Sequence, residues 1–499
     1  MGKLPKKVLL IIFTILSFSA NTFPRIRVQE DISVITYRVG GNRSQSFYPK
    51  NQTRYLYESK IGFENTLNKN VFYGNIFYRS TDDTLVDPQS FSIEQIYFGC
   101  KNDKMDFVMG HREGPWLYDI DGKKKLFNLH SNGGVFNLRH RNQEISALLK
   151  EQLNHYDIGN HHLISKSRAE LAAKIAELMP GDLDYTIFGV SGGEAIDLAI
   201  KVARSYTNRK KIISVYGGYH GHTGLSLQTG DAKYRSPFLL DSPDFIQVPF
   251  NDLDAIKSVL QNDVAAVILE TIPATLGMPL PEENYLKEIK NNCKNTGALL
   301  ILDEVQAGLG RTGKLWAFEH FDVIPDMVVL AKGLSGGIYP ISVTVIDKKL
   351  ETVFHDDPFI HISTSGGSEL GSVVAQKVLE ISSSAEFLEN VNHLSEAFQK
   401  ELEKLQQKHH KYFIGIRRKG LMMGLVLKDE LAGPLLTKTA YDNELLIIYA
   451  NNDTSVVQFL PPLIMEEKDM DLVIKKLDKA LKQAKILHPM LKLKERFLQ

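Results

Sequence analysis

Two apolar stretches of the sequence each end in a residue that could do chemistry. ALLILDE runs into Asp303, with Gln306 three residues later, and MVVLAK ends in Lys332. Singly, these residues have ordinary explanations, because Asp often ends a strand and Lys can extend to solvent. A desolvated lysine, however, loses its proton more easily and becomes a nucleophile toward carbonyl groups. Because the interval between the two residues suits one strand–helix–strand unit, both can face one crevice.

A glycine-rich turn opens a helical stretch at GVSGGEA, which contains Ser191, Gly192 and Gly193. Such a turn presents free backbone N–H groups and the positive end of a helix dipole, and this arrangement can bind a phosphate. Turns of this kind are also common between strands and helices, so this one alone does not establish a phosphate site.

A further apolar run leads into GYHGHT, which contains Tyr219, His220 and His222. An aromatic ring at this position can stack on a flat ligand. The two histidines have no accompanying cysteine or acid cluster, so we predict no metal site.

Pyridoxal 5'-phosphate is a cofactor that needs an amine, an acid, a phosphate seat and a stacking ring together. Its aldehyde condenses with a lysine, its protonated ring nitrogen needs a carboxylate, and its phosphate needs a helix N-terminus. We therefore predict that Lys332 carries this cofactor, that Asp303 holds the ring-nitrogen proton, and that Gln306 reaches the ring hydroxyl.

These residues lie in an alternation of short apolar strands and amphipathic helices that begins near residue 165. The strand candidates are TIFGVS, KKIISVYG, FIQVPF, VAAVILE, ALLILDE, MVVLAK and ISVTVI. Strands that are apolar throughout and separated by helices favour a buried, mostly parallel sheet. We expect an α/β fold with its ligand at the carboxyl ends of the strands.

The first residues differ from the rest of the chain. A basic MGKLPKK precedes the uncharged VLLIIFTILSFSA, so residues 1–20 are predicted to be a signal peptide or an anchor. An uncleaved anchor would bring the protein to a membrane, whereas the catalytic part is typical of a cytoplasmic enzyme. Residues 21–104 form an extension without an assigned role. We expect a large domain over 161–390 and a smaller domain built from 105–160 and 391–499.

Composition excludes several classes of function. The 499 residues are 43% hydrophobic and 24% charged, and the 59 basic and 59 acidic side chains leave a formal net charge of +0. No global basic field favours nucleic acid. Two cysteines, Cys100 and Cys293, cannot build a disulfide framework.

The sequence resembles the class III aminotransferases, pyridoxal phosphate enzymes of fold type I. The block LILDEVQAGLGRTGKLWAFEHFDVIPDMVVLAKGLSGG is the most specific part, with support from GVSGGEAIDLAIKVAR, GGYHGHT and HISTSGGSELG, and the resemblance covers roughly residues 105–485. It implies a large domain with a seven-stranded, mostly parallel sheet between helices. A smaller α+β domain would come from the N- and C-terminal segments.

The resemblance also implies a role for each residue that matches a motif. Lys332 forms the internal Schiff base, and Asp303 pairs with the pyridine nitrogen. The remaining cofactor contacts are expected from Ser191, Gly192, Gly193, Tyr219, His220, Gln306 and Thr364. Because the Thr364 position is donated by the neighbouring subunit in this family, we expect a homodimer with shared sites.

Three positions depart from the family pattern. Gly193 stands where relatives often have Thr or Ser, and Ser368-Glu369 replaces Asn-Pro. Gln458 stands where many relatives have an Arg that holds a substrate carboxylate. Either Arg139 or Arg141 holds the carboxylate instead, or one substrate has no carboxylate beside its amine, as in an ω-amino acid, a diamine or an amino sugar.

The leading interpretation is an aminotransferase acting on a small amine and a keto or aldehyde acceptor. An aminomutase or lyase on the same scaffold, or a non-catalytic binding protein, are the alternatives. The sequence does not identify the donor or the acceptor.

Overall fold

The computed structural model describes residues 79–80, 85–86 and 107–498. The chain divides into two units, Met1–Val108 and Met109–Gln499. In the first unit, β1 (Arg79–Ser80) pairs antiparallel with β2 (Leu85–Val86). The predicted signal or anchor at 1–20 lies outside the described residues, as does most of the 21–104 extension. No helix in the described part of the chain has the length and apolar character needed to cross a membrane.

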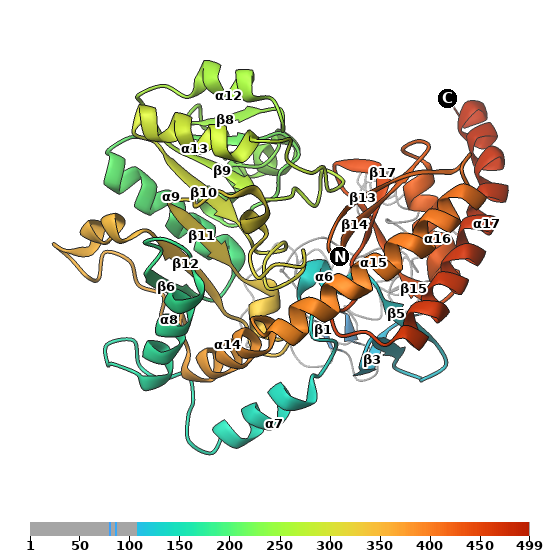
Figure 1. The fold of residues 1–499 in the computed structure, drawn as a ribbon, viewed down its shortest axis with the longest axis horizontal. Helices are drawn as coiled ribbons and strands as arrows, with labels where there is room; N and C mark the ends of the chain where they lie inside the picture. Colours follow the sequence, from blue (N-terminus) through green and yellow to red (C-terminus); the bar gives the residue numbers. More distant parts are fainter. Residues whose placement is uncertain (1–78, 81–84, 87–106, 499) are drawn as a thin grey trace, which may run out of the picture. The chain divides into compact units, whose positions relative to one another are not determined.

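The second unit is built on a seven-stranded sheet with the strand order β6-β12-β11-β10-β9-β7-β8 (Figure 1). The strands are β6 (Tyr185–Gly189), β7 (Lys211–Val215), β8 (Phe245–Val248), β9 (Val264–Glu270), β10 (Leu299–Asp303), β11 (Met327–Leu330) and β12 (Ser342–Ile346). Every strand candidate of the sequence is in this sheet, which confirms the α/β fold. Only β12 within it runs antiparallel to its neighbours.

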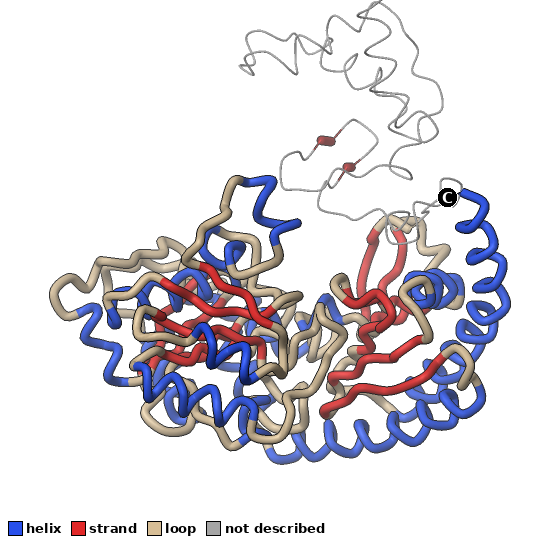
Figure 2. The backbone as a smooth tube through the Cα atoms, turned by 90° about the horizontal axis from the view of Figure 1, so that it is seen from above, coloured by secondary structure: helices blue, strands red, loops and turns tan. Residues whose placement is uncertain are grey.

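Helices lie on both sides of this sheet (Figure 2), which explains why its central strands are apolar on both faces. Along β10, Leu299 and Ile301 pack into one buried cluster, whereas Leu300 and Leu302 pack into another. Side chains of a strand alternate between faces, so each face needs its own apolar partner. On one face that partner is α9 (Gly192–Thr207), whose apolar stripe, Ala195, Leu198, Ala199, Val202 and Ala203, is buried.

The other helices around the large sheet are short or amphipathic. They are α7 (Gln143–Gln152), α8 (Lys166–Leu178), α10 (Gly224–Gln228), α11 (Ala232–Arg235), α12 (Leu253–Val259), α13 (Tyr285–Thr296) and α14 (Glu369–Ser382). The element α6 (Ser131–Gly134) is a turn whose four residues all have positive φ. This part of the chain also has short 3₁₀ helices, η2 (Ser236–Phe238), η3 (Ala317–Phe321), η4 (Lys332–Ser335) and η5 (Lys348–Phe354).

Two smaller sheets form the separate small domain. One has the order β13-β14-β17-β16, with β13 (Phe413–Lys419), β14 (Met422–Leu427), β16 (Ile448–Ala450) and β17 (Asp453–Phe459). The other has the order β15-β5-β4-β3, with β3 (Met109–Glu113), β4 (Trp116–Asp119), β5 (Lys125–Asn128) and β15 (Leu445–Leu446). Because β15 pairs with β5, N- and C-terminal segments share one sheet, as expected.

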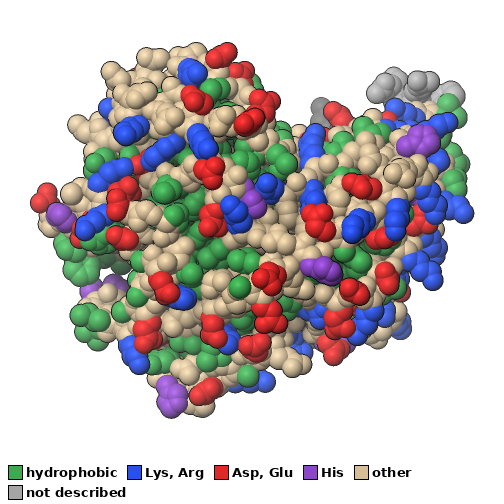
Figure 3. All heavy atoms as spheres, viewed as in Figure 1, with side chains coloured by type: hydrophobic (Ala, Val, Ile, Leu, Met, Phe, Trp, Pro, Cys, Tyr) green, Lys and Arg blue, Asp and Glu red, His purple; other side chains and the backbone are tan. Residues whose placement is uncertain are grey.

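Three long helices belong to the C-terminal part, α15 (Ala385–Lys408), α16 (Ala432–Asp442) and α17 (Glu467–Leu498). The last continues through Pro489. On the visible face, basic and acidic side chains are intermixed (Figure 3), in keeping with the balanced charge.

Candidate active site

Three ionisable groups, Glu270, Asp303 and Lys332, lie at or just after the carboxyl ends of β9, β10 and β11. Asp303 ends β10 and is in register with Glu270, the last residue of β9, and with Val329 of β11. Lys332 follows β11 after one intervening residue. The predicted convergence of Lys332 and Asp303 at the end of the parallel strands thus follows from the register.

Lys332 is held by an amide rather than by a carboxylate. Its Nζ donates to Gln306 Oε1 at 3.0 Å, and among the described residues no carboxylate oxygen lies within ion-pair distance. Burial lowers the pKa of Lys332, while the more distant charges of Asp303 and Glu270 raise it. Its backbone is left-handed, with φ +43°, a strained conformation that is often found at functional positions.

The α6 turn passes directly beside the amine. A Cβ at Gly133 would lie 3.2 Å from both Lys332 Nζ and Gln306 Oε1, and the residue has φ +65°. Glycine therefore satisfies two requirements here, the left-handed backbone and the close approach. The sequence analysis did not single out this turn, although the pair Gly133-Gly134 was the available signal.

Both oxygens of Asp303 accept hydrogen bonds. His220 Nδ1–H donates to Oδ2 at 2.8 Å, and the backbone N–H of Val305 donates to Oδ1 at 3.0 Å. Asp303 and His220 are buried, and His220 Nε2 has no partner among the described residues. The predicted cofactor residue His220 is thus brought into contact with Asp303.

Glu270 belongs to this group and was missed by the sequence analysis. Its carboxylate accepts from the backbone N–H of Tyr219 at 2.9 Å and of Ala274 at 3.1 Å. Burial raises the pKa of Glu270, His220 opposes the shift and Asp303 adds to it, and the pKa is about 7 as a result. An acid that ends the apolar run VAAVILE was the same signal that identified Asp303.

The N-terminus of α9 is the expected phosphate seat. Ser191 is its N-cap and accepts from Glu194 N at 3.3 Å. Gly192 and Gly193 follow, and the first N–H groups of a helix have no acceptor within the helix. A Cβ at Gly193 would lie 2.8 Å from Thr223 Oγ1. The hydroxyl that the sequence lacks at position 193 is therefore present nearby on Thr223.

Tyr219 stands at the open side of the group, with 40% of its surface exposed. Its ring lies 5.2 Å from that of His222, centroid to centroid. Partial desolvation and the nearby Glu270 and Asp303 raise the pKa of the Tyr219 phenol, so the ring remains neutral. The exposed ring can stack on a flat ligand.

Thr364 is not brought to this group within the chain. It is exposed in the loop between η5 and α14, and it has no hydrogen bond to another described residue. The prediction that Thr364 serves a neighbouring subunit stays a prediction.

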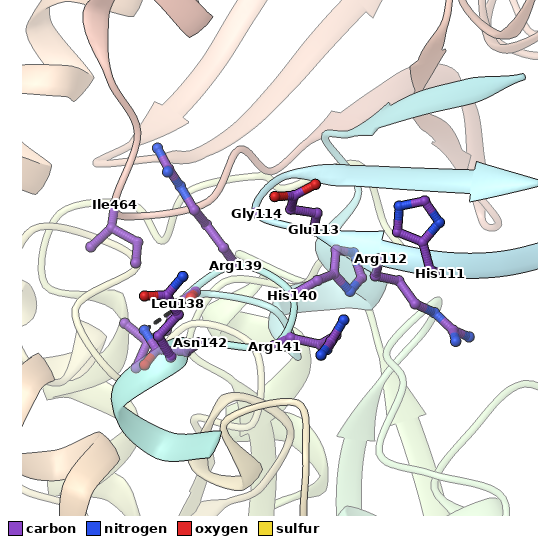
Figure 4. A pocket seen from close by; sticks show the side chains of 11 residues that line it. His111, Arg112, Glu113, Gly114, Leu138, Arg139, His140, Arg141, Asn142 and Ile464 are labelled. Atoms are coloured by element: carbon purple, nitrogen blue, oxygen red, sulfur yellow. Dashed lines mark hydrogen bonds between the residues drawn. The ribbon is translucent and has the colours of Figure 1, made fainter. Parts of the chain in front are cut away.

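Gln458, on β17 of the small domain, is buried beside the amine. Its Oε1 accepts from Gln306 Nε2 at 3.4 Å, so Gln458, Gln306 and Lys332 form a chain of polar contacts across the two domains. Arg139 and Arg141, which were considered as carboxylate holders, instead line a pocket beside β3 (Figure 4). Neither arginine hydrogen-bonds to Lys332, Asp303 or Gln306 in the described part of the chain.

Arg311 fastens the large sheet to the small domain. It is fully buried, and its guanidinium donates to Leu421 O at 3.2 Å, Pro461 O at 2.6 Å and Asn137 Oδ1 at 2.6 Å. Burial lowers the pKa of Arg311 to about 9. These bonds fix Asn137, which follows the α6 turn, relative to the loop that precedes Lys332.

Glu304, the second acid after ALLIL, supports the structure. It accepts from Thr271 Oγ1, from Ala317 N at 2.7 Å and from Phe318 N at 3.1 Å. Burial raises the pKa of Glu304 to about 7. Of the two neighbouring acids, Asp303 thus lies on the side of the Lys332 amine, whereas Glu304 accepts from backbone N–H groups at the start of η3.

These residues fit pyridoxal 5'-phosphate. A partly buried amine without a carboxylate partner among the described residues, a buried carboxylate, the first N–H groups of α9 and an accessible aromatic ring are the donor set that this cofactor needs. Within the residues that are described, no group of three His, Cys, Asp or Glu side chains could hold a metal ion.

Comparison with known proteins places the chain in a family. The family described as Aminotransferase class-III matches residues 97–481. An uncharacterized aminotransferase of Archaeoglobus fulgidus is 55% identical over 380 residues, which is 76% of this chain and 89% of that protein. A putrescine aminotransferase of Pectobacterium atrosepticum is 33% identical over 377 residues, 74% of this chain and 80% of that protein.

The fold is also that of solved relatives. The ornithine aminotransferase of Toxoplasma gondii superimposes with a TM-score of 0.72 at 24% identity, over 79% of this chain and 94% of that one. The chain belongs to the class III aminotransferases, enzymes that use pyridoxal phosphate. The predicted family and cofactor are confirmed.

Proposed function

We propose that this enzyme moves an amino group from an amine donor to a keto or aldehyde acceptor, with pyridoxal phosphate bound covalently through Lys332 Nζ. The observation that carries the proposal is the partly buried amine of Lys332. Among the described residues its hydrogen-bond partner is the neutral Gln306 amide at 3.0 Å, and it lies at the same end of the sheet as Asp303. Removing a lysine from solvent without a charged partner is costly unless the amine has a use.

Each residue of the site has its own role in the proposed reaction. When bound, pyridoxal phosphate supplies an electron-withdrawing ring that stabilises negative charge on the substrate carbon. Because burial lowers its pKa, Lys332 Nζ can take a proton from that carbon and return it. Asp303, fixed by His220 and Val305 N, holds the proton of the ring nitrogen. The N–H groups at the start of α9 bind the phosphate.

We further propose that the donor has no carboxylate beside the reacting amine, as in ω-amino acids, diamines and amino sugars. Gln458 supports this because it reaches Gln306 at 3.4 Å and is neutral. A neutral amide cannot supply the two parallel charge-assisted bonds that Arg gives a carboxylate. The relative named putrescine aminotransferase adds support for a diamine.

The test is a donor panel of 1,4-diaminobutane, β-alanine and L-alanine, compared by kcat/KM in wild type and Gln458→Arg. The matched control is Gln399→Arg, at a partly exposed position on α15. Wild type should prefer the first two donors, and Gln458→Arg should shift the ratio toward L-alanine by roughly tenfold or more. A wild-type preference for L-alanine that Gln458→Arg leaves unchanged would refute the donor assignment.

The same assay separates the reaction types. An aminotransferase places the amino group on the acceptor and releases a keto or aldehyde product from the donor. Free ammonia as the main product would indicate a lyase, and an isomerised donor would indicate an aminomutase.

We also propose that the enzyme is a homodimer in which Thr364 serves the partner's site. Two loops that touch through a His162–Phe359 ring contact at 5.6 Å expose Leu163 (68%), Ile164 (100%) and Ile360 (57%). An apolar surface of this kind is typical of an interface. Thr364, also exposed, follows the second loop.

Subunit mixing tests the shared site. Lys332→Ala and Thr364→Ala protomers are mixed, and each mixed dimer would have one doubly altered site and one intact site. Cofactor retention and activity should therefore recover on mixing. If mixing gives only the average of the two parents, the sites are not shared.

A further inference from the structure

A second pocket, separate from the Lys332 group, lies between β3 and the loop that leads into α7 (Figure 4). Its volume is about 550 Å³, which is a size that holds a small organic molecule. The charged and imidazole side chains in its wall are those of His111, Arg112, Glu113, Arg139, His140 and Arg141. None of these residues hydrogen-bonds to Lys332, Asp303, Gln306 or Gln458 in the described part of the chain.

Two of the three arginines in the wall, Arg112 and Arg141, have no ion pair with a described residue. The third, Arg139, pairs with Asp469 and lies 4.0 Å from Glu466, and Glu113 is the one carboxylate among the lining residues. The only hydrogen bond from the Arg112 side chain to a described residue goes to Met109 Sδ at 3.7 Å, and Arg141 has no ion pair there. Arg139 Nη2 contacts Asp469 Oδ2 at 3.3 Å, but its buried Nε has no partner among the described residues. Among the described residues, Arg112 and Arg141 therefore have guanidinium donors without a carboxylate acceptor.

His140 adds a neutral donor to this wall. Asn128 Oδ1 accepts from His130 N at 3.2 Å and Ser131 N at 2.8 Å, so the Asn128 amide nitrogen must be the donor in its 2.9 Å contact with His140 Nε2. The proton of the neutral ring then lies on Nδ1. Burial and the adjacent Arg112 lower the pKa of His140 to about 4, so the ring is a neutral N–H donor at neutral pH.

The backbone holds these side chains in a conformation that their residue types disfavour. Arg139 has φ +65° and Arg141 has φ +51°. Glycine would adopt this left-handed conformation without strain, whereas a residue with a Cβ does so at a cost. Two arginines in such positions, on either side of His140, indicate that the side chains have a use of their own.

We propose that this pocket binds a small dianion that carries a phosphate group or two carboxylates. Planar guanidinium groups bind both kinds of oxyanion through paired hydrogen bonds. Arg112 and Arg141, the two arginines of the wall that have no ion pair with a described residue, would find acceptors in such a dianion. The site is independent of the amine donor and of the chemistry at Lys332.

Calorimetric titration of the cofactor-loaded full chain tests the proposal, with inorganic phosphate and succinate as probes and sodium chloride at equal ionic strength as the reference. Loading with cofactor keeps the phosphate seat at α9 filled. We expect saturable binding of one probe per chain that chloride does not reproduce. Preference for inorganic phosphate assigns the site to phosphate groups, and preference for succinate assigns it to dicarboxylates.

Variants locate the binding. Arg112→Gln combined with Arg141→Gln should weaken binding of the preferred probe roughly tenfold or more, because two charge-assisted contacts are lost. Arg418→Gln on β13, where Arg418 pairs with Glu396 at 3.0 Å, is the matched control and should bind as wild type does. No saturable binding of either probe, or an equal loss in the control, would overturn the proposal.

Arg141→Gly separates binding from folding. Glycine relieves the left-handed strain at φ +51°, so the thermal midpoint should be no lower than that of wild type, while affinity for the probe falls. Unchanged affinity in this variant and in the double variant would show that the arginines do not form the site.

Discussion

Arg311 and Arg141 show two ways in which this chain uses an arginine. Arg311 is fully buried, and its guanidinium donates to three oxygens of the chain itself. Arg141 is exposed beside a pocket and has no ion pair with a described residue. A buried charge whose acceptors are supplied by the chain is part of the fold. A charge whose acceptors are missing depends on solvent or on a ligand.

Lys332 belongs to neither class. It is partly buried, whereas Arg311 is fully buried, and its hydrogen-bond partner among the described residues is a neutral amide. The comparison therefore predicts that substitutions will separate by what they damage. Changes at Lys332 and Asp303 should affect chemistry, changes at Arg311 should affect stability, and changes at Arg141 should affect only binding.

The largest effect is expected at the amine. Lys332→Ala should lower turnover by roughly four orders of magnitude or more, because the nucleophile and the proton carrier are lost together. Lys349→Ala, which removes an ion pair with Asp326, is the control and should retain turnover. Borohydride reduction followed by peptide mapping should find the cofactor on Lys332, and a label on another lysine would contradict the assignment.

A smaller loss is expected at the carboxylate. Asp303→Asn should retain some cofactor but turn over on the order of a thousandfold more slowly, because a neutral amide cannot hold the ring proton. Asp326 is a buried aspartate at the opposite end of β11, and Asp326→Asn should lower stability without this loss in rate. A near-normal rate in Asp303→Asn would exclude the proposed role.

Substitution of Arg311 should lower the free energy of unfolding, whereas substitution of Arg141 should not. Arg311→Met leaves Leu421 O, Pro461 O and Asn137 Oδ1 without their donor, and should cost about 3 kcal/mol or more of unfolding free energy. Arg141→Gly should cost none. Equal losses in denaturant titrations of the two variants would remove the distinction between them.

The smallest effect concerns the pH dependence of stability. The pKa of Glu270 is raised from 4.5 to about 7 in the folded protein, so the folded state binds the extra proton between these values. Glu270 therefore makes the unfolding free energy fall as pH rises through this range, by at most about 1.4 kcal/mol per unit. Glu270→Gln should lose this part of the slope. If the difference in unfolding free energy between Glu270→Gln and wild type is the same at pH 5 and at pH 8, the raised pKa of Glu270 is contradicted.

The sequence predicts the large sheet well because burial on both faces imposes an apolar run on each strand. Asp303 and Lys332 could be found because each interrupts such a run at its end. Glu270 gave the same signal and was overlooked. The contact between Gln306 and Gln458 could not be predicted, since the residues come from different sheets and no local pattern relates them.

The pocket beside β3 was equally hidden from sequence reasoning. Arg139 and Arg141 were noted as arginines, but local propensity assigns left-handed backbone to Gly or Asn and not to Arg. Their positive φ values are set by the way the loop packs against β3, where His140 N donates to Gly114 O at 2.8 Å. Tertiary contacts override propensity at this loop.

The antiparallel β12 has a consequence for the order in which the site assembles. Residues 331–341, which include Lys332, join β11 to β12 by a short local connection at one edge of the sheet. Closing a short loop costs little entropy. By contrast, the pairing of β6 with β12, in which Gly189 lies opposite Ser342, joins the first and the last strand of the large sheet in sequence order, and such long-range pairing is slow. We therefore expect the lysine loop to gain hydrogen-exchange protection early during refolding. The phosphate seat after β6 should be among the last parts to form.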